Sequence, residues 1–212
     1  MGLRYVALGD SYTIGTSVAV ADRWPDRLIE ALRVPAGSSP LELVANLAVN
    51  GRTSGDVIRS QLPELDRLRP ELVSLLIGVN DVVQGVPEST YRANIEAILR
   101  ALVGRLPPDR LVVVTTPDYT VTPAGADYGD PTVQRARIVR FNALLAEVAA
   151  DARIAVVDIF DISQRATTDG TLVASDGLHP SGAQYARWVD RIAPVVRGLL
   201  GSAPAVERPR PA

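Results

Sequence analysis

Residues 3–15 read LRYVALGDSYTIG, and this stretch sets the architecture expected for the whole chain. Residues 5–8 form an apolar run of buried-strand length, and Gly9-Asp10-Ser11 ends it with a polar turn. In open α/β sheets, ligands bind outside the carboxyl ends of the strands, which is where Ser11 would lie. The turn therefore predicts a functional serine, with simple capping of the next turn by Ser11 as the alternative.

Beyond this stretch, apolar runs of strand length alternate with helical patterns. Further strands are predicted at 41–47, 72–77, 111–115 and 154–157. Helices are predicted to begin at Trp24, Thr53, Glu88, Asp130 and Ser181. This alternation implies a parallel sheet covered on both faces. With right-handed crossovers we predict an α/β protein of three α/β/α layers, with a flavodoxin-like five-stranded parallel sheet in the order 2-1-3-4-5.

Length and composition indicate one globular domain. With 212 residues, 47% of them hydrophobic and 22% charged, the chain can bury a substantial core. We assign residues 1–201 to this domain and expect the Pro- and Ala-rich residues 202–212 to form a disordered tail.

Charge and hydropathy argue against two kinds of partner. The formal net charge is -2, so no basic field attracts nucleic acid. No apolar run reaches the roughly 18 residues that a membrane span requires. Met1 and Gly2 lead directly into the first strand, which favours a cytoplasmic protein, although a signal sequence removed beforehand would leave the same residues. The oligomeric state cannot be read from the sequence.

The residue types that are missing exclude several chemistries. All 22 basic residues are arginines, which excludes P-loop lysines, Schiff-base lysines and Ser–Lys dyads. The chain has no cysteine, so disulfides, thiolate nucleophiles and cysteine-based metal sites are excluded. A single histidine rules out a multi-histidine metal centre. We therefore expect no cofactor and no metal.

His179 is the only imidazole that could serve a serine nucleophile as a base. It lies at 175–180 (SDGLHP), between the last strand and the last helix, and so at the same sheet edge as Ser11. Asp176 could accept from its Nδ1–H and fix the tautomer, with Gly177 permitting the tight turn. The alternatives are a histidine that only fills the surface or core and an aspartate that only forms an Asx turn.

Donors for an oxyanion are available in three turns. The side-chain amide of Asn80 follows the third strand, the N–H of Gly51 is unobstructed by a side chain, and Ser11 offers its own N–H. The competing interpretations are that Asn50-Gly51 is an ordinary turn dipeptide and that Asn80-Asp81 is an ordinary cap.

Four short blocks in this order resemble the SGNH hydrolases of the GDSL esterase/lipase family. They are GDSY at 9–12, NLAVNG at 46–51, GVND at 78–81 and DGLHP at 176–180. The first departs from the GDSL letters only at Tyr12. Each block is a weak motif alone, but together they cover nearly the whole chain.

The resemblance implies a catalytic triad and an oxyanion hole. Ser11 would be the nucleophile, His179 the base and Asp176 its partner. Ser11, Gly51 and Asn80 would supply the oxyanion donors. The implied activity is that of a serine hydrolase acting on carboxylic esters through an acyl-enzyme, with a small-molecule ester as the partner.

Other functions stay open at this stage. A thioesterase or a carbohydrate O-deacetylase would use the same machinery. A non-catalytic, flavodoxin-like binding domain is a further alternative, although residues 9–15 lack the G-x-G-x-x-G and GK[ST] spacings. The long connection at 117–130 is expected to line the substrate site together with 82–84, or to form a purely structural loop.

Overall fold

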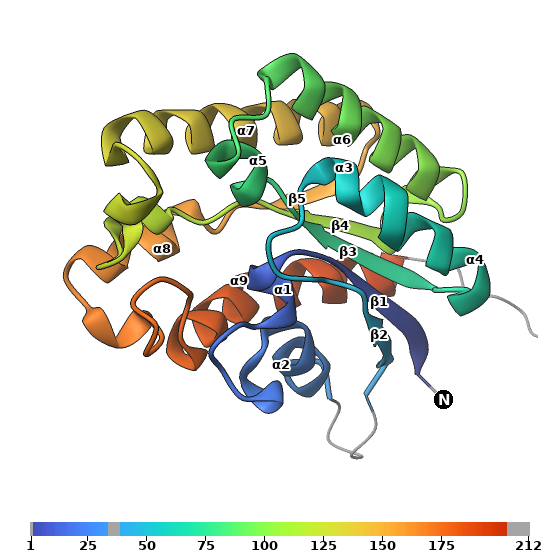
Figure 1. The fold of residues 1–212 in the computed structure, drawn as a ribbon. Helices are drawn as coiled ribbons and strands as arrows, with labels where there is room; N and C mark the ends of the chain where they lie inside the picture. The colour runs from blue at the N-terminus through green and yellow to red at the C-terminus, as the bar shows by residue number, and fades with distance from the viewer. Residues whose placement is uncertain (1, 34–38, 203–212) are drawn as a thin grey trace, which may run out of the picture.

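A computed structural model describes residues 2–33 and 39–202. Its centre is one parallel sheet in the order β2-β1-β3-β4-β5, which confirms the predicted topology (Figure 1). The strands are β1 (Leu3–Gly9), β2 (Leu41–Asn46), β3 (Leu72–Leu76), β4 (Leu111–Val114) and β5 (Ala155–Val157). Of the tail expected at 202–212, only Ser202 lies within the described residues.

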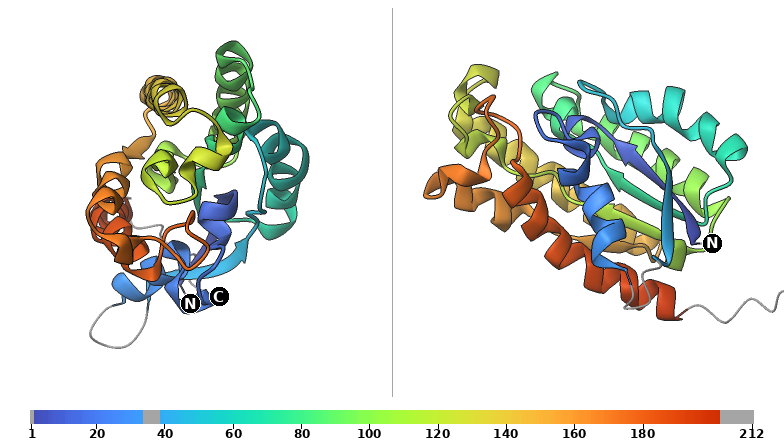
Figure 2. Two further views of the ribbon diagram at one scale, coloured as in Figure 1. Left: turned by 60° about the vertical axis from the view of Figure 1, so that its left-hand side comes forward. Right: turned by 90° about the horizontal axis from the view of Figure 1, so that it is seen from below.

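Helices cover both faces of the sheet. They are α1 (Ser11–Ile14), α2 (Trp24–Ala31), α3 (Ser54–Asp56), α4 (Leu65–Leu68), α5 (Val79–Val83), α6 (Glu88–Val103), α7 (Pro131–Asp151), α8 (Phe160–Gln164) and α9 (Gly182–Ser202). In Figures 1 and 2, α2 and α9 lie together on one face, and α3, α4, α6 and α7 lie on the other. The result is the predicted three-layer arrangement.

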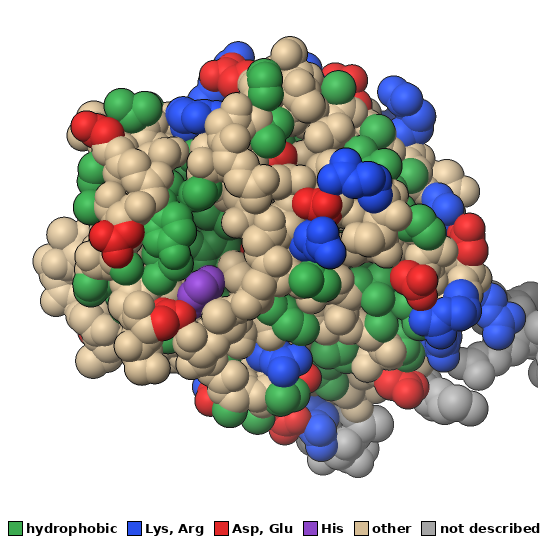
Figure 3. Space-filling view, viewed as in Figure 1, with side chains coloured by type: hydrophobic (Ala, Val, Ile, Leu, Met, Phe, Trp, Pro, Cys, Tyr) green, Lys and Arg blue, Asp and Glu red, His purple; other side chains and the backbone are tan. Residues whose placement is uncertain are grey.

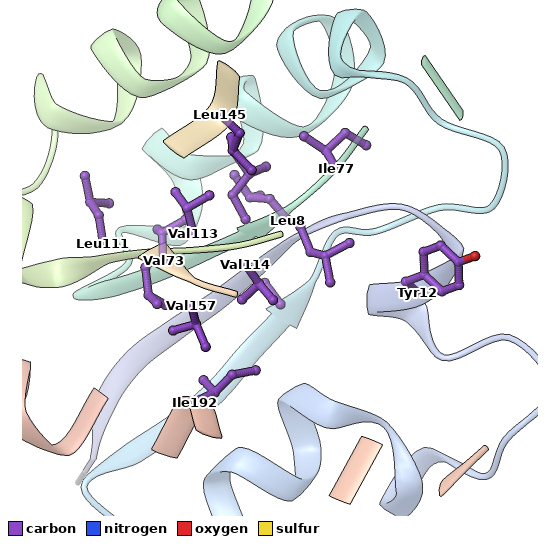
Figure 4. Close-up of a cluster of buried hydrophobic side chains, with 14 of the residues drawn as sticks. Leu8, Tyr12, Val73, Ile77, Leu111, Val113, Val114, Leu145, Val157 and Ile192 are labelled. Carbon is purple, nitrogen blue, oxygen red and sulfur yellow. The ribbon is translucent and has the colours of Figure 1, made fainter. Parts of the chain in front are cut away.

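The core forms where the two helical layers meet the central strands. Every residue of β3 is buried, as expected for a strand covered on both faces. Figure 4 shows Val73, Val113 and Val157 from three neighbouring strands, with Leu145 of α7 and Ile192 of α9 packed from opposite sides.

Two of the predicted helix starts are built as the sequence indicates. Pro25 lies in the first turn of α2, where its missing N–H costs nothing. Asp130 caps α7, because its Oδ1 accepts from the N–H groups of Thr132 and Val133.

The helix predicted to run from Thr53 to Pro70 is interrupted. After α3 the chain forms a π-helical turn at Val57–Gln61 and a 3₁₀ turn at Leu62–Glu64 before α4 begins. Pro63 has no N–H to donate, and its ring crowds the carbonyl four residues earlier, so a regular α-helix is disfavoured at this point. A capping contact is present at the predicted start, Thr53, since its N–H donates to Asp56 Oδ2 at 2.9 Å.

The strand order reverses at β1, whose two neighbours are β2 and β3. The turns after β1 and β3 therefore open on a common crevice. Within 2–33 and 39–202, no helix combines the length and the apolarity needed to cross a bilayer.

Candidate active site

The turn after β1 presents Ser11 at the start of α1. Gly9 has φ of 155°, and a Cβ there would lie 2.5 Å from the Leu76 carbonyl oxygen, so only glycine fits. Asp10 then caps α1, since its Oδ1 accepts from the N–H of Tyr12 at 3.0 Å. Ser11 is 7% exposed, and that small exposed part faces a cavity.

This cavity of about 240 Å³ brings together four of the five site residues predicted from the sequence, namely Ser11, Gly51, Asn80 and His179. The remaining described residues around it are Tyr12, Asn50, Val79, Val83, Tyr119, Tyr128 and Leu178. Figure 3 shows the histidine, in purple, at the edge of a hollow with hydrophobic walls. Segments that are far apart in the sequence thus meet at one edge of the sheet.

The fifth predicted residue, Asp176, lies behind His179 and uses its two oxygens differently. Oδ2 is 2.7 Å from His179 Nδ1. Oδ1 accepts from the N–H groups of Leu178 and His179, at 2.9 and 3.0 Å. The Asx turn, which was an alternative to the carboxylate–imidazole pair, therefore coexists with it, and together they fix the ring.

Ser17 is a contact of Asp176 that sequence reasoning missed. Its Oγ donates to Asp176 Oδ2 at 2.5 Å, beside the imidazole. Burial alone would raise the pKa of Asp176, but the hydrogen bonds from Ser17, Leu178 and His179 hold the pKa well below its usual range. Asp176 is therefore ionised throughout the neutral range and can act only as an acceptor.

We expect Ser17→Ala to lower kcat/KM for the ester hydrolysis that the sequence implies by about 3- to 10-fold. One charge-assisted hydrogen bond is lost, and water replaces it in part. Ser17 has φ of 65°, a strained value for a residue with a Cβ. Ser17→Gly removes the same hydroxyl without that strain. Steady-state kinetics should show the same loss of kcat/KM for both variants, and thermal unfolding should show that the glycine variant is the more stable of the two. Full activity in both would exclude a role for the hydroxyl.

Side-chain amides hold the segments that carry two of the predicted oxyanion donors, Gly51 and Asn80. Asn80 Nδ2 donates to the Arg52 carbonyl at 2.9 Å, which leaves its second N–H unused by that contact. Gln84 Nε2 donates to the Gly51 carbonyl at 3.1 Å. A Cβ at Gly51 would meet nothing within 4 Å, so φ of 77°, rather than space, is what favours glycine there.

Asp10 is a buried carboxyl next to the serine. It is 0% exposed, and in the described part of the chain its Oδ2 has no hydrogen-bond partner. Burial raises the pKa of Asp10 from 3.8 to about 8, the Tyr12 N–H lowers it in part, and the charge of Asp81 raises it further. The folded state therefore holds a proton that the unfolded chain releases near pH 4.

This proton makes the wild type less stable as the pH rises from about 4 to 8, because the folded state binds more protons over that range. Asp10→Asn keeps the capping oxygen and removes the titration. Its stability relative to wild type should therefore increase by about 2 to 5 kcal/mol across this range. Urea unfolding at several pH values measures the difference. A flat curve for Asp10→Asn would contradict the prediction.

Two tyrosines from the long connection form part of the cavity wall. Tyr119 and Tyr128 belong to 3₁₀ turns at Tyr119–Val121 and Gly125–Tyr128, and their rings meet edge to face with centroids 6.0 Å apart. Val83, from the other segment expected at the site, also lines the cavity. The placement expected for 117–130 beside 82–84 is thus observed.

The whole arrangement has the parts that acyl transfer requires: a hydroxyl, an imidazole with an oriented tautomer, and N–H donors around one small cavity. Neither Ser17 nor the tyrosines belong to any of the four sequence blocks. Only the position of 117–130 after a strand pointed to the tyrosines, and no sequence signal pointed to Ser17.

Comparisons with known proteins agree with this arrangement. The model of the GDSL-like lipase/acylhydrolase family matches residues 7–187. An arylesterase from Vibrio mimicus is 30% identical over 97 residues, which is 45% of this chain and 46% of that protein, so the match spans about half of the relative's length.

Solved structures share the fold. A lipase/acylhydrolase from Enterococcus faecalis gives a TM-score of 0.73 at 20% identity, over 93% of this chain and 96% of that one. A variant of an acetyl xylan esterase from Geobacillus stearothermophilus gives 0.72 at 16% identity, over 92% and 94%.

Proposed function

Because the chain belongs to the GDSL-like lipase/acylhydrolase family, we propose that it hydrolyses small carboxylic esters through an acyl-enzyme formed on Ser11. The observation that carries the proposal is the convergence of Ser11, His179, Gly51 and Asn80 on one cavity, with Asp176 holding the far side of the imidazole.

In the first step, Ser11 Oγ attacks the ester carbonyl carbon while His179 Nε2 takes the hydroxyl proton. Asp176 keeps Nδ1 protonated and balances the charge that forms on the ring. The carbonyl oxygen becomes an oxyanion that accepts from the N–H groups of Ser11 and Gly51 and from Asn80 Nδ2. When the tetrahedral intermediate collapses, the alcohol leaves with the proton from His179.

In the second step, water attacks the acyl-enzyme and gives its proton to His179. The same donors hold the second oxyanion, and collapse releases the carboxylic acid while the proton returns to Ser11. Each donor contributes on the order of 3 kcal/mol to the stability of the transition state.

The cavity favours a small, uncharged ester. At about 240 Å³ it is below the usual range of drug-sized sites, about 300 to 1,000 Å³, and its walls include Val79, Val83 and Leu178. No arginine lines it among the described residues, so the phosphates of an acyl-CoA would meet no cation there. The name of the acetyl xylan esterase that shares the fold fits an ester with a small acyl group, and the name of the arylesterase relative fits an ester of an aryl alcohol.

A substrate panel tests this function. p-Nitrophenyl esters of increasing chain length should give kcat/KM values that are highest for acetate to butyrate and fall for longer chains. Acyl-CoA thioesters and acetylated xylo-oligosaccharides are compared at equal concentration. Faster turnover of either would reassign the enzyme as a thioesterase or a carbohydrate O-deacetylase. No turnover of any ester, together with no labelling by a fluorophosphonate, would overturn the proposal.

A further inference from the structure

A glutamine side chain supplies short hydrogen bonds to the end of β1, next to the serine turn. The last registered pair between β1 and β2 is Ala7 with Asn46, and just beyond it the Leu47 N–H still donates to the Ala7 carbonyl at 2.9 Å. Gly9 lies beyond this pair, and both of its polar groups meet Gln61. The Gly9 N–H donates to Gln61 Oε1 at 2.9 Å, and Gln61 Nε2 donates to the Gly9 carbonyl at 2.7 Å. Gln61 is only 2% exposed.

This pairing takes the place of hydrogen bonds in a parallel ladder, where the N–H and C=O of one residue both point to the same neighbouring strand. The backbone after β2 approaches Gly9 through a longer contact, 3.4 Å from the Val49 N–H to the Gly9 carbonyl. The shorter pair of hydrogen bonds therefore comes from Gln61, whose primary amide presents an acceptor and a donor side by side.

The break in the predicted helix explains how Gln61 is available. Gln61 is the last residue of the π-helical turn Val57–Gln61, which is closed by the Leu62 N–H donating to the Val57 carbonyl. Such turns contain one more residue than an α-helical turn and occur frequently at functional sites. Here the wide turn ends with a long polar side chain buried against β1.

Gln61 also connects two parts of the candidate active site. Gly9 immediately precedes Asp10 and Ser11 in the chain. The segment that ends at Gln61 begins with Gly51 at the cavity. Its middle is fixed to α5, since the N–H and Oγ of Ser54 both donate to the Asp81 carboxylate, at 2.9 and 2.5 Å. The Gln61–Gly9 pair thus links the serine turn directly to the segment that carries a predicted oxyanion donor.

We propose that Gln61 is a positioning residue, whose amide holds the Ser11 turn in register with Gly51 so that the nucleophile and the oxyanion donors meet the carbon and the oxygen of the same ester carbonyl. This inference rests on the proposed function, because it assigns Ser11 as the nucleophile. Because Gln61 would act only by positioning the Ser11 turn, its loss should slow the chemical step and leave ground-state binding of the substrate intact.

Two substitutions test the donor and the acceptor. Gln61→Leu removes both and should lower kcat by about 10- to 100-fold, the range expected for a misplaced reacting group, with KM within about threefold of wild type. Gln61→Glu keeps the shape. As a neutral acid it offers one acceptor and one O–H donor, as the amide does, but as a carboxylate it can only accept.

The pH dependence of Gln61→Glu supplies a specific readout. Its kcat divided by the wild-type kcat at the same pH should be as low as that of Gln61→Leu at pH 8 and should rise as the pH falls to 5. Asp10 and the other titratable groups of the wild type are present in both proteins, so their contribution largely cancels in the ratio. The corresponding ratio for Gln61→Leu should stay flat.

Asn142 provides a matched control. It is a buried amide on α7 that makes the same double contact with Thr116, accepting from its N–H and donating to its carbonyl, both at 2.8 Å. Asn142→Asp therefore disturbs an equivalent amide at the end of β4 without touching the Ser11 turn. It should lower thermal stability to a similar degree as Gln61→Glu while changing kcat by less than about threefold.

The outcomes separate this inference from the proposed function. If the wild type turns over no ester, the proposed function fails. If the wild type is active, a Gln61→Leu kcat within threefold of wild type overturns the role of Gln61 alone. Should Gln61→Leu not fold, the pH series decides: a rising ratio for Gln61→Glu supports the inference and a flat one overturns it. A rise in KM with unchanged kcat also overturns it.

Discussion

Ser11→Ala is expected to lower kcat for ester hydrolysis by about 10⁴- to 10⁶-fold while leaving KM close to the wild-type value. The substitution removes the atom that forms the acyl-enzyme. The oxyanion donors and the cavity walls remain, so substrate still binds and a small residual rate persists. Ser11 opens α1 without capping it, since Asp10 supplies the cap, so the fold should tolerate alanine.

His179→Ala should produce a loss of the same order, because Ser11 then has no base. The double variant should lose little more than either single one, since the two side chains act as a unit. Circular dichroism and unfolding check that each variant is folded, and a fluorophosphonate reports the reactivity of Ser11. Near-normal hydrolysis by either single variant would remove that residue from the mechanism.

The sequence predicted the sheet order because the alternation of apolar runs and helical patterns, combined with right-handed crossovers, leaves few topologies. The same topology predicted that Ser11, Gly51, Asn80 and His179 would meet, since the carboxyl ends of parallel strands share one edge. Their meeting at one cavity therefore follows from strand order rather than from any single motif.

The contacts that the sequence did not predict depend on where side chains from distant elements point in the fold. Ser17 reaches Asp176 over a separation of 159 residues, and Gln61 reaches Gly9 over 52. Hydrophobic periodicity also predicted one regular helix where a π-helical turn precedes Pro63, and that turn places Gln61 at the strand end. Local pattern determines which elements form, whereas contacts between elements determine which polar groups pair.

Asp176→Asn is the second substitution with a large expected effect. The loss would be smaller than for His179→Ala if a backbone carbonyl also held the imidazole. In the described part of the chain, the hydrogen-bond partner of His179 Nδ1 is Asp176. We therefore expect kcat to fall by about 10⁴-fold, as for loss of the correct tautomer in a triad.

The two oxygens of Asp176 explain why asparagine fails here. The backbone N–H groups of Leu178 and His179 require an acceptor at the Oδ1 position, so the asparagine oxygen must occupy it. The asparagine NH₂ then faces Nδ1 and donates to it. This selects the tautomer with the proton on Nε2, which cannot take a proton from Ser11.

Kinetics of Asp176→Asn should show this loss in kcat with little change in KM, and the fluorophosphonate should label Ser11 correspondingly slowly. Asp169→Asn is the matched control, because Asp169 Oδ1 accepts from the Thr171 N–H in a similar turn away from the cavity. That control should retain wild-type kcat. A loss below about tenfold for Asp176→Asn would mean that the tautomer is set by another group, and the triad assignment of Asp176 would be withdrawn.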